Sequence, residues 1–176
     1  KKIQVNNWCY GKPFNEKGWL YMGNIQIGKE LKMENILSLR KKMTQEEMQK
    51  EMVKIGQFFE ANGIKKSGYI TTTTYSIDSD GTLDMEILVP MDKLVDLPSE
   101  YRLKPVFKLL NAVYARHEGN PANLQNVYNE MLAYIKENNL QQITTGYNVT
   151  VKDITPDMSI DEVVIDVYIG VSENVL

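Results

Sequence analysis

The chain has 176 residues, a hydrophobic fraction of 43% and a formal net charge of −3. This length and composition predict one domain with a hydrophobic core, and the acidic balance without a basic stripe argues against a nucleic-acid partner. One cysteine and one histidine exclude a disulfide framework and leave too few ligands for a zinc site. No apolar run of about 18 residues and no secretory leader is present, so we expect a cytoplasmic protein with no membrane partner.

Residues 1–30 contain two segments of strand-like composition, residues 3–10 and 19–27, with a polar turn between them. We expect a β-hairpin extension there, and it holds both tryptophans, Trp8 and Trp19. Its aromatic side chains predict a cover for a ligand cleft or a surface for a protein partner or a second copy. The alternative is that they form the core of the extension itself.

The remaining chain contains an internal repeat, because residues 31–64 align without a gap with residues 107–140. Apolar, capping and turn positions match, although few residues are identical. The repeat predicts one domain over residues 1–176, with a first β-α-β-β copy over 31–91, a linker over 92–105 and a second copy over 106–176. A chance match of two ordinary α/β segments is the alternative interpretation.

In the first copy, alternating apolar residues predict a strand over residues 31–39. Thr44, followed three residues later by Glu47, has the pattern of a helix capping box. The apolar stripe of that helix comprises Met48, Met52, Ile55 and Phe59. Asn62 and Gly63 are expected to end the helix, and Asp80–Gly81 to turn the hairpin that follows.

The second copy repeats this order. Alternation predicts a strand over residues 107–116, and Gly119, Asn120 and Pro121 predict a turn into a helix. The helical stripe comprises Leu124, Tyr128, Met131, Leu132 and Ile135. We expect the last two strands over residues 147–152 and 162–171.

Two carboxylates hold matching places in the last strand of each copy. Strand alternation directs Ile87 and Val167 toward the helices, so Glu86 and Asp166 lie on the opposite face of the sheet. If a pseudo-twofold axis relates the copies, these side chains converge near the joint between them. The alternative is that both acids are ordinary solvated residues of the sheet face.

The stretch Glu86-Ile87-Leu88-Val89-Pro90-Met91 resembles the Glu-aliphatic-x-aliphatic-Pro-aliphatic signature of GyrI-like (gyrase-inhibitor-like) domains. Residues 114–119, followed by a helix, are similar to the strand-to-helix junction of the same superfamily. The resemblance covers roughly residues 31–172 and implies an α+β fold. Tandem β-α-β-β units would form a mainly antiparallel sheet with two helices on one face and a ligand cleft between the copies, here with an N-terminal β-hairpin added.

In regulator members of that superfamily, an acidic residue in the last strand of the second copy lies among aromatic side chains and attracts cationic, apolar drugs. By position, the resemblance assigns this role to Asp166. The chain departs from the pattern in having Asp instead of Glu, and Gly170 where the first copy has Pro90. The expected ligand-binding residues are Glu86, Asp166, Tyr168, Tyr114, Tyr69, Tyr147 and Trp19. Packing roles are the alternative for two of the four tyrosines.

We expect a stand-alone, effector-type module that binds a small lipophilic or cationic molecule. It would have no DNA-binding domain, cofactor, metal or catalytic residue of its own. One alternative is an accessory protein of a bacterial toxin-secretion locus, which binds a protein partner or a second copy through the N-terminal hairpin. The other is a small hydrolase with Glu86 or Asp166 as the general base.

Overall fold

The computed structural model describes residues 8–9, 12–13, 25–152 and 157–173, to which all structural statements below refer. The elements in chain order are β1 (Trp8–Cys9), β2 (Lys12–Pro13), β3 (Gln26–Met43), α1 (Gln45–Ala61), β4 (Thr71–Ile77), β5 (Leu83–Pro90), β6 (Arg102–Glu118), the 3-10 turn η1 (Pro121–Asn123), α2 (Leu124–Glu137), β7 (Leu140–Thr150), the 3-10 turn η2 (Ile160–Glu162) and β8 (Val164–Glu173). From β3 onward, each half has the order β-α-β-β, within the α+β class that the sequence predicts.

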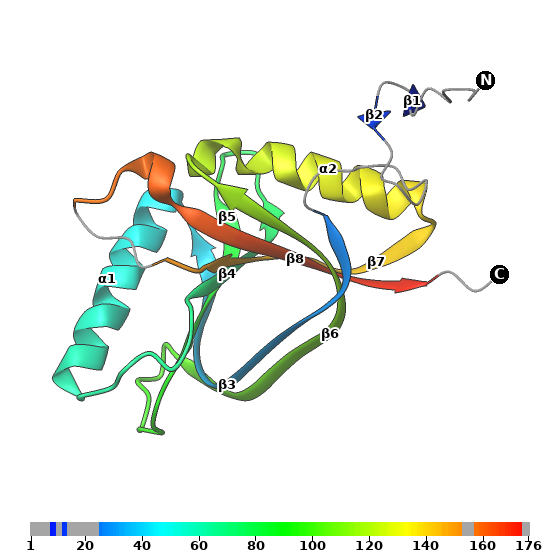
Figure 1. Ribbon diagram of the computed structural model, residues 1–176. Coiled ribbons are helices and arrows are strands. Elements are labelled where there is room, and N and C mark those ends of the chain that lie inside the picture. The colour runs from blue at the N-terminus through cyan, green and yellow to red at the C-terminus, as the bar shows by residue number, and fades with distance from the viewer. Residues whose placement is uncertain (1–7, 10–11, 14–24, 153–156, 174–176) are drawn as a thin grey trace, which may run out of the picture.

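The six long strands form a closed antiparallel barrel in the order β3-β5-β4-β7-β8-β6. The pairing of β3 with β6, the first strands of the two halves, closes the barrel. β3 pairs with β5 and β6, and β6 pairs with β3 and β8. Figure 1 shows β3 and β6 running together as a long arch that bows away from the other strands. The sequence predicts the antiparallel sheet, and the structure adds its closure into a barrel.

The first helix begins where the capping pattern predicts. The Glu47 backbone N–H donates to Thr44 Oγ1 over 3.2 Å, and the Thr44 backbone N–H donates to Glu47 Oε2 over 2.7 Å. The second helix begins later than predicted. Asn120 caps the short turn η1, and the α-helical hydrogen bonding starts only at Leu124.

Three clusters of buried residues fill the fold. The first lies between α1 and the strands of the first half and includes Leu37, Leu39, Ile55, Phe59, Ile87 and Val89. The second lies between α2 and the second half and includes Val113, Met131, Ile135, Ile165, Val167 and Ile169. The third lies on the opposite face of the strands, called here the inner face, and comprises Leu31, Met33, Ile36, Leu88, Leu109, Ala112, Tyr147 and Val149. The helices therefore cover the outer face, and the β3–β6 arch packs across the inner face.

Three strand boundaries differ from the sequence-based expectation. β7 begins at Leu140, directly after α2, and its pairing with β8 is irregular between Gln142 and Gly146. β6 begins at Arg102, inside the range predicted as a linker, and β3 begins at Gln26, inside the range predicted as an extension. Gly28 adopts a positive φ of 72° where the β3–β6 register shifts, a bulge that sequence alternation does not reveal.

The predicted N-terminal hairpin lies largely outside the described residues. Within it the structure describes β1 and β2, which pair with each other as a two-stranded sheet, and the first residues of β3. None of the described helices has the length and apolarity that crossing a membrane requires.

Candidate functional site

The inner face carries both carboxylates that the sequence singles out. Glu86 in β5 is 2% exposed and Asp166 in β8 is 6% exposed, so the interpretation of either acid as a solvated surface residue is wrong. Strand pairing arranges the inner face in two rows across β5, β4, β7 and β8, namely Glu86–Thr73–Tyr147–Tyr168 and Leu88–Thr71–Val149–Asp166. Glu86 stands at the β5 end of the first row and Asp166 at the β8 end of the second. The two acids therefore lie on opposite sides of the joint between the halves.

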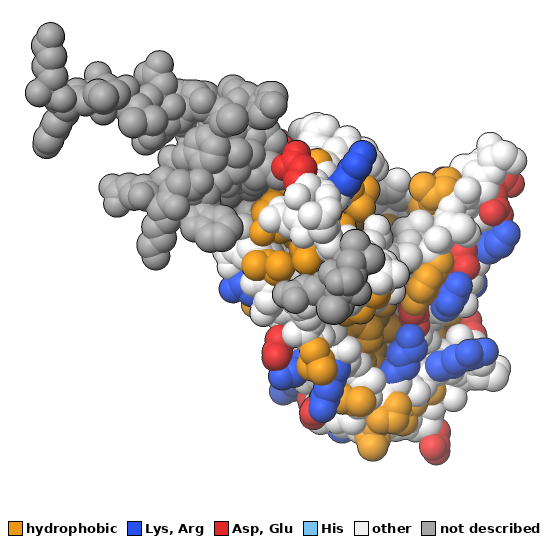
Figure 2. Space-filling view, turned by 90° about the vertical axis from the view of Figure 1, so that its right-hand side faces the viewer, with side chains coloured by type: hydrophobic (Ala, Val, Ile, Leu, Met, Phe, Trp, Pro, Cys, Tyr) orange, Lys and Arg blue, Asp and Glu red, His pale blue; other side chains and the backbone are white. Residues whose placement is uncertain are grey.

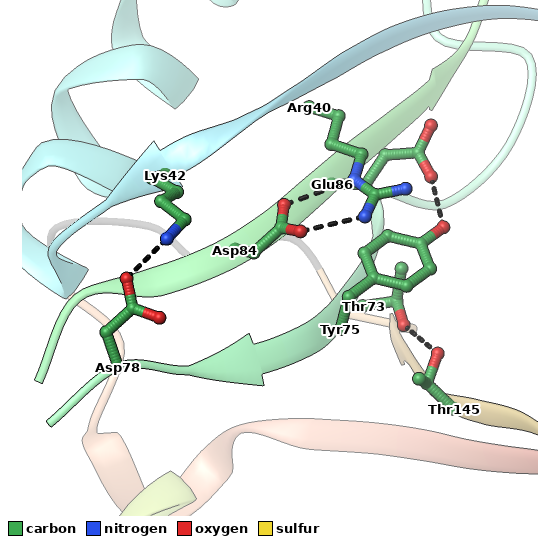
Figure 3. A network of polar contacts seen from close by, with 8 residues as sticks. All are labelled: Arg40, Lys42, Thr73, Tyr75, Asp78, Asp84, Glu86 and Thr145. Atoms are coloured by element: carbon green, nitrogen blue, oxygen red, sulfur yellow. Dashed lines mark hydrogen bonds and ion pairs between the residues drawn. The ribbon is translucent and has the colours of Figure 1, made fainter.

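The joint itself is the β4–β7 pair. Thr73 Oγ1 lies 2.7 Å from Thr145 Oγ1 and donates to the Gly146 carbonyl over 2.8 Å. Figure 3 shows these threonines close to Tyr75, whose hydroxyl reaches Glu86. A hydroxyl-lined seam therefore connects the first carboxylate to the second half of the barrel.

Glu86 is held by three donors from three strands. The Ser38 hydroxyl donates to Oε1 over 2.5 Å, the Tyr75 hydroxyl donates to Oε2 over 2.7 Å, and the Lys104 ammonium pairs with Oε1. Burial alone would raise the pKa of the Glu86 carboxyl, but these three donors outweigh burial and hold that pKa below its ordinary value. Burial, together with the bond to Glu86, raises the pKa of the Tyr75 hydroxyl, so this hydroxyl remains a donor.

Arg40 faces Glu86 across the strand pair but binds another acid. Its Nε and Nη2 donate to Asp84 Oδ1 and Oδ2 over 3.1 and 2.8 Å, and its guanidinium carbon lies 3.7 Å from the centre of the Tyr75 ring. Figure 3 shows Arg40 between these two side chains. Glu86 is therefore paired with a lysine from β6, while the arginine of the first half lies outside that contact.

In the second half, the arginine does bind the buried acid that it faces. Arg116 faces Asp166 across the β6–β8 pair, and its Nε and Nη2 donate to Asp166 Oδ1 and Oδ2 over 2.7 and 3.0 Å. The Tyr114 hydroxyl adds a third donor to Oδ1 over 2.9 Å, and the Tyr114 ring lies 5.1 Å from the ring of Tyr168. Burial first, and then the bond to Asp166, raise the pKa of Tyr114 to about 12. We call Asp166, Arg116, Tyr114 and Tyr168 the Asp166 subsite.

One position explains why the two arginines differ. Arg40 and Arg116 are equivalent in the repeat, as are Asp84 and Val164. In the first half Asp84 provides a carboxylate for Arg40, whereas Val164 provides none for Arg116. Asp166 is the acid directly across the strand pair from Arg116. Arg116 therefore binds it through two parallel N–H donors, Nε and Nη2.

A cavity of about 530 Å³ opens on the inner face, and none of the four residues of the Asp166 subsite lines it. Its walls include Leu31 and Met33 of the arch, Tyr69 before β4, Pro90 at the end of β5, and Thr71 and Val149 at the joint. Val149 pairs directly with Asp166, so the carboxylate stands one strand away from the cavity wall. Figure 2 shows a hollow on one face of the molecule in which hydrophobic side chains gather, with Lys and Arg side chains around it.

The structure brings together three of the predicted ligand-binding residues, Asp166, Tyr114 and Tyr168. Tyr147 is buried instead, with its ring 4.9 Å from that of Phe107 in the inner cluster, which is the packing alternative. Tyr69 lines the cavity and is 54% exposed. Trp19 lies outside the described residues.

Sequence reasoning missed four residues that bind the acids: the hydroxyl donors Ser38 and Tyr75, and the cations Lys104 and Arg116. For Arg116 a signal existed, because the alternation that directs Asp166 inward does the same for a residue facing it on the paired strand. Lys104 gave no such signal, since its contact with Glu86 depends on the closure of the barrel by β3 and β6.

Gly170 is explained by packing. A Cβ atom at this position would lie 2.7 Å from Leu109 Cδ1 and 2.8 Å from Thr144 Oγ1, the atom to which the Gly170 N–H donates over 2.8 Å. No side chain fits there without moving Thr144. At the position equivalent to Pro90, the second half therefore has a glycine because neighbouring side chains lie close to its backbone.

Among the described residues, no group of three or more His, Cys, Asp or Glu side chains is placed to hold a metal ion. His117 is buried, and its Nε2 lies 3.0 Å from the Asn120 carbonyl oxygen at the start of η1. Its position indicates a structural role in the turn between β6 and η1.

These features define a ligand-binding domain made of two β-α-β-β halves. The chain belongs to the GyrI-like small molecule binding domain family, whose family model matches residues 28–172. No curated protein sequence matched the chain.

Solved structures share this fold at low sequence identity. The C-terminal domain of EcmrR superposes with a TM-score of 0.68 and 18% identity, over 85% of this chain and 98% of that domain. EcmrR in its complex with DNA superposes with a TM-score of 0.69 and 17% identity, over 86% of this chain and 59% of that longer chain. An uncharacterised conserved protein from Listeria innocua gives a TM-score of 0.60 and 14% identity, over 82% of this chain and 93% of that one. At these identities the likeness shows the fold alone.

Proposed function

We propose that this chain binds a small organic cation with an apolar body on the inner face of its barrel, without catalysing a reaction. The observation that supports this most strongly is the Asp166 subsite. Its buried carboxylate accepts from Tyr114, whose ring packs on that of Tyr168, and is neutralised by the side chain of Arg116, itself 44% exposed. A buried carboxylate requires a cation, and here that cation sits at the solvent boundary.

The neighbouring cavity suits the body of such a ligand. Its volume of about 530 Å³ falls within the range of roughly 300–1,000 Å³ usual for small-molecule sites. Leu31, Met33 and Val149 supply apolar walls, and Tyr69 stands at the rim. The lining also includes two acidic side chains and one lysine, so the cavity is net negative, which favours a ligand that carries a positive charge on a hydrophobic framework.

The chemistry of the carboxylates does not favour a hydrolase. A general base works best with a pKa near the working pH, whereas the pKa of Glu86 lies below its ordinary value. The oxygens of both acids are already engaged by donors from their own half or from the arch. Tyr114, with a pKa of about 12, stays protonated and serves as a donor.

The experiment that tests this function is a calorimetric titration of the full chain with three ligands of nearly equal shape. These are phenethylammonium, the neutral phenethyl alcohol and the anionic phenylacetate. We expect the cation to bind at least about tenfold more tightly than the other two, a difference of about 1.4 kcal/mol. Equal affinity for all three, or preference for the anion, would show that the acids do not select the ligand.

A further inference from the structure

The Asp166 subsite already contains a planar cation, the guanidinium of Arg116. Both carboxylate oxygens receive an N–H donor from it, at 2.7 Å for Oδ1 and 3.0 Å for Oδ2. This parallel pair of bonds requires two coplanar donors at fixed spacing, which guanidinium and amidinium groups provide and a single ammonium does not.

We propose that the Asp166 subsite selects planar amidinium and guanidinium ligands, which take the place of Arg116 on the carboxylate. The inference rests on the proposed function and goes further by naming the class of cation. In this arrangement Arg116 is a competitor within the chain: it keeps the carboxylate neutral when no ligand is present, and only a cation with an equivalent donor fork replaces it without loss of hydrogen bonds.

Exposure of the two partners supports an exchange. The Arg116 side chain is 44% exposed, so its guanidinium reaches water by a rotation of the side chain alone, while the Asp166 side chain is only 9% exposed and remains buried. A quaternary ammonium ligand has no N–H group. In the same position it would leave two buried carboxylate oxygens with only the Tyr114 hydroxyl as donor, and unpaired buried acceptors are costly.

The surroundings of the carboxylate fit a flat cation. The rings of Tyr114 and Tyr168 are 5.1 Å apart with an angle of 55° between their planes, and both face the inner side of the barrel. The Lys29 ammonium lies 5.7 Å from the centre of the Tyr114 ring, so this ring already accepts a cation. An aromatic body attached to the amidinium would extend past Val149 toward the cavity.

The first half provides the internal contrast. Glu86 binds one ammonium and two hydroxyls, none of which forms a planar fork, and Arg40 is held by Asp84 and Tyr75. Bidentate binding of a guanidinium to a buried carboxylate is therefore a feature of the second half. Arg40 is the matched position for a control variant.

The test compares benzamidine with benzyltrimethylammonium on the full chain, its Arg116→Ala variant and the Arg40→Ala control, by calorimetry. For the unaltered chain we expect benzamidine to bind more tightly. If Arg116 occupies the carboxylate in about 90% of molecules, its removal strengthens benzamidine binding about tenfold. Arg40→Ala should leave both affinities unchanged.

Thermal unfolding keeps the test valid if Arg116→Ala folds poorly. Benzamidine should then raise the melting temperature of that variant more than benzyltrimethylammonium does, and Arg116→Lys, which keeps the charge and loses the fork, should bind benzamidine more tightly than the unaltered chain. Equal affinity of the two cations, or no gain on removing Arg116, overturns the inference while leaving cation binding intact. Failure of every cation to bind any of these proteins overturns the proposed function itself.

Discussion

Arg40 and Arg116 stand at equivalent positions of the two halves, each directly across a strand pair from a buried carboxylate, yet only Arg116 binds that carboxylate. The difference follows from one neighbouring residue. Asp84 draws Arg40 toward the Tyr75 ring, whereas Val164 at the matching position offers Arg116 no acid. The two halves share a backbone plan and differ in how each neutralises its acid.

The Glu86 network should stabilise the fold at neutral pH and lose this effect in acid. Because the pKa of Glu86 is lower in the folded chain than its ordinary value of 4.5, the stabilisation is present above pH 4.5 and disappears as the pH falls through the folded-state pKa. We expect Glu86→Gln to reduce the free energy of unfolding at pH 7 by about 2 kcal/mol, since it weakens three donor contacts. Urea unfolding at several pH values measures this.

The control for that experiment is the exposed pair formed by Lys152 and Glu162. Glu162→Gln should change the free energy of unfolding by less than about 0.5 kcal/mol, because surface ion pairs contribute little. A difference between Glu86→Gln and the unaltered chain that stays constant from pH 7 down to pH 3 would contradict the role assigned to the Glu86 carboxylate.

Gly170→Ala should destabilise the chain by about 1–3 kcal/mol, because the new methyl group would press on Leu109 and Thr144. Thr144 has little freedom to move, since its hydroxyl accepts the Gly170 N–H and donates to the Thr145 carbonyl. Gly56→Ala in α1 is the matched control. A Cβ there meets nothing within 4 Å, and alanine should stabilise the helix by about 0.5–1 kcal/mol. Denaturant midpoints that shift in the same direction for both variants would speak against this packing argument.

Tyr114→Phe should reduce the free energy of unfolding by about 1 kcal/mol, because it removes a donor to Asp166 and keeps the ring contact with Tyr168. The pKa of Tyr114 is raised from 10.0 to about 12 in the folded chain. The stabilisation from its hydrogen bond to Asp166 is therefore complete below pH 10 and is lost as the pH rises toward 12. Chemical unfolding between pH 8 and 12 should show the two proteins converging at high pH. The exposed Tyr69→Phe serves as the control, and convergence at low pH would contradict the assignment.

The sequence reveals the local part of this fold well. The Thr44–Glu47 capping box gives the start of α1 to the residue, and strand alternation directs Ile87 and Val167 toward the helices. These features depend on neighbours a few positions away in the chain. The bulge at Gly28 and the closure of the barrel by β3 and β6 depend on pairing between distant strands, which alternation does not encode.

The candidate site was predictable to the same extent. Alternation and equivalence within the repeat identify Asp166, and Tyr114 and Tyr168 lie close to it because their strands pair in register. The alternation also holds for Arg116, but its choice of Asp166 depends on Val164, a residue whose significance appears only once Arg40 and Asp84 are seen in contact. Long-range donors such as Lys104 require the three-dimensional fold.

The affinity of phenethylammonium for Asp166→Asn, relative to the unaltered chain, tests the central claim most directly. Asparagine keeps the size of the side chain and removes the negative charge, so the account predicts a loss of at least about tenfold in affinity, with the fold verified by its melting temperature. An affinity equal to that of the unaltered chain would contradict the assignment of Asp166 as the group that selects a cation.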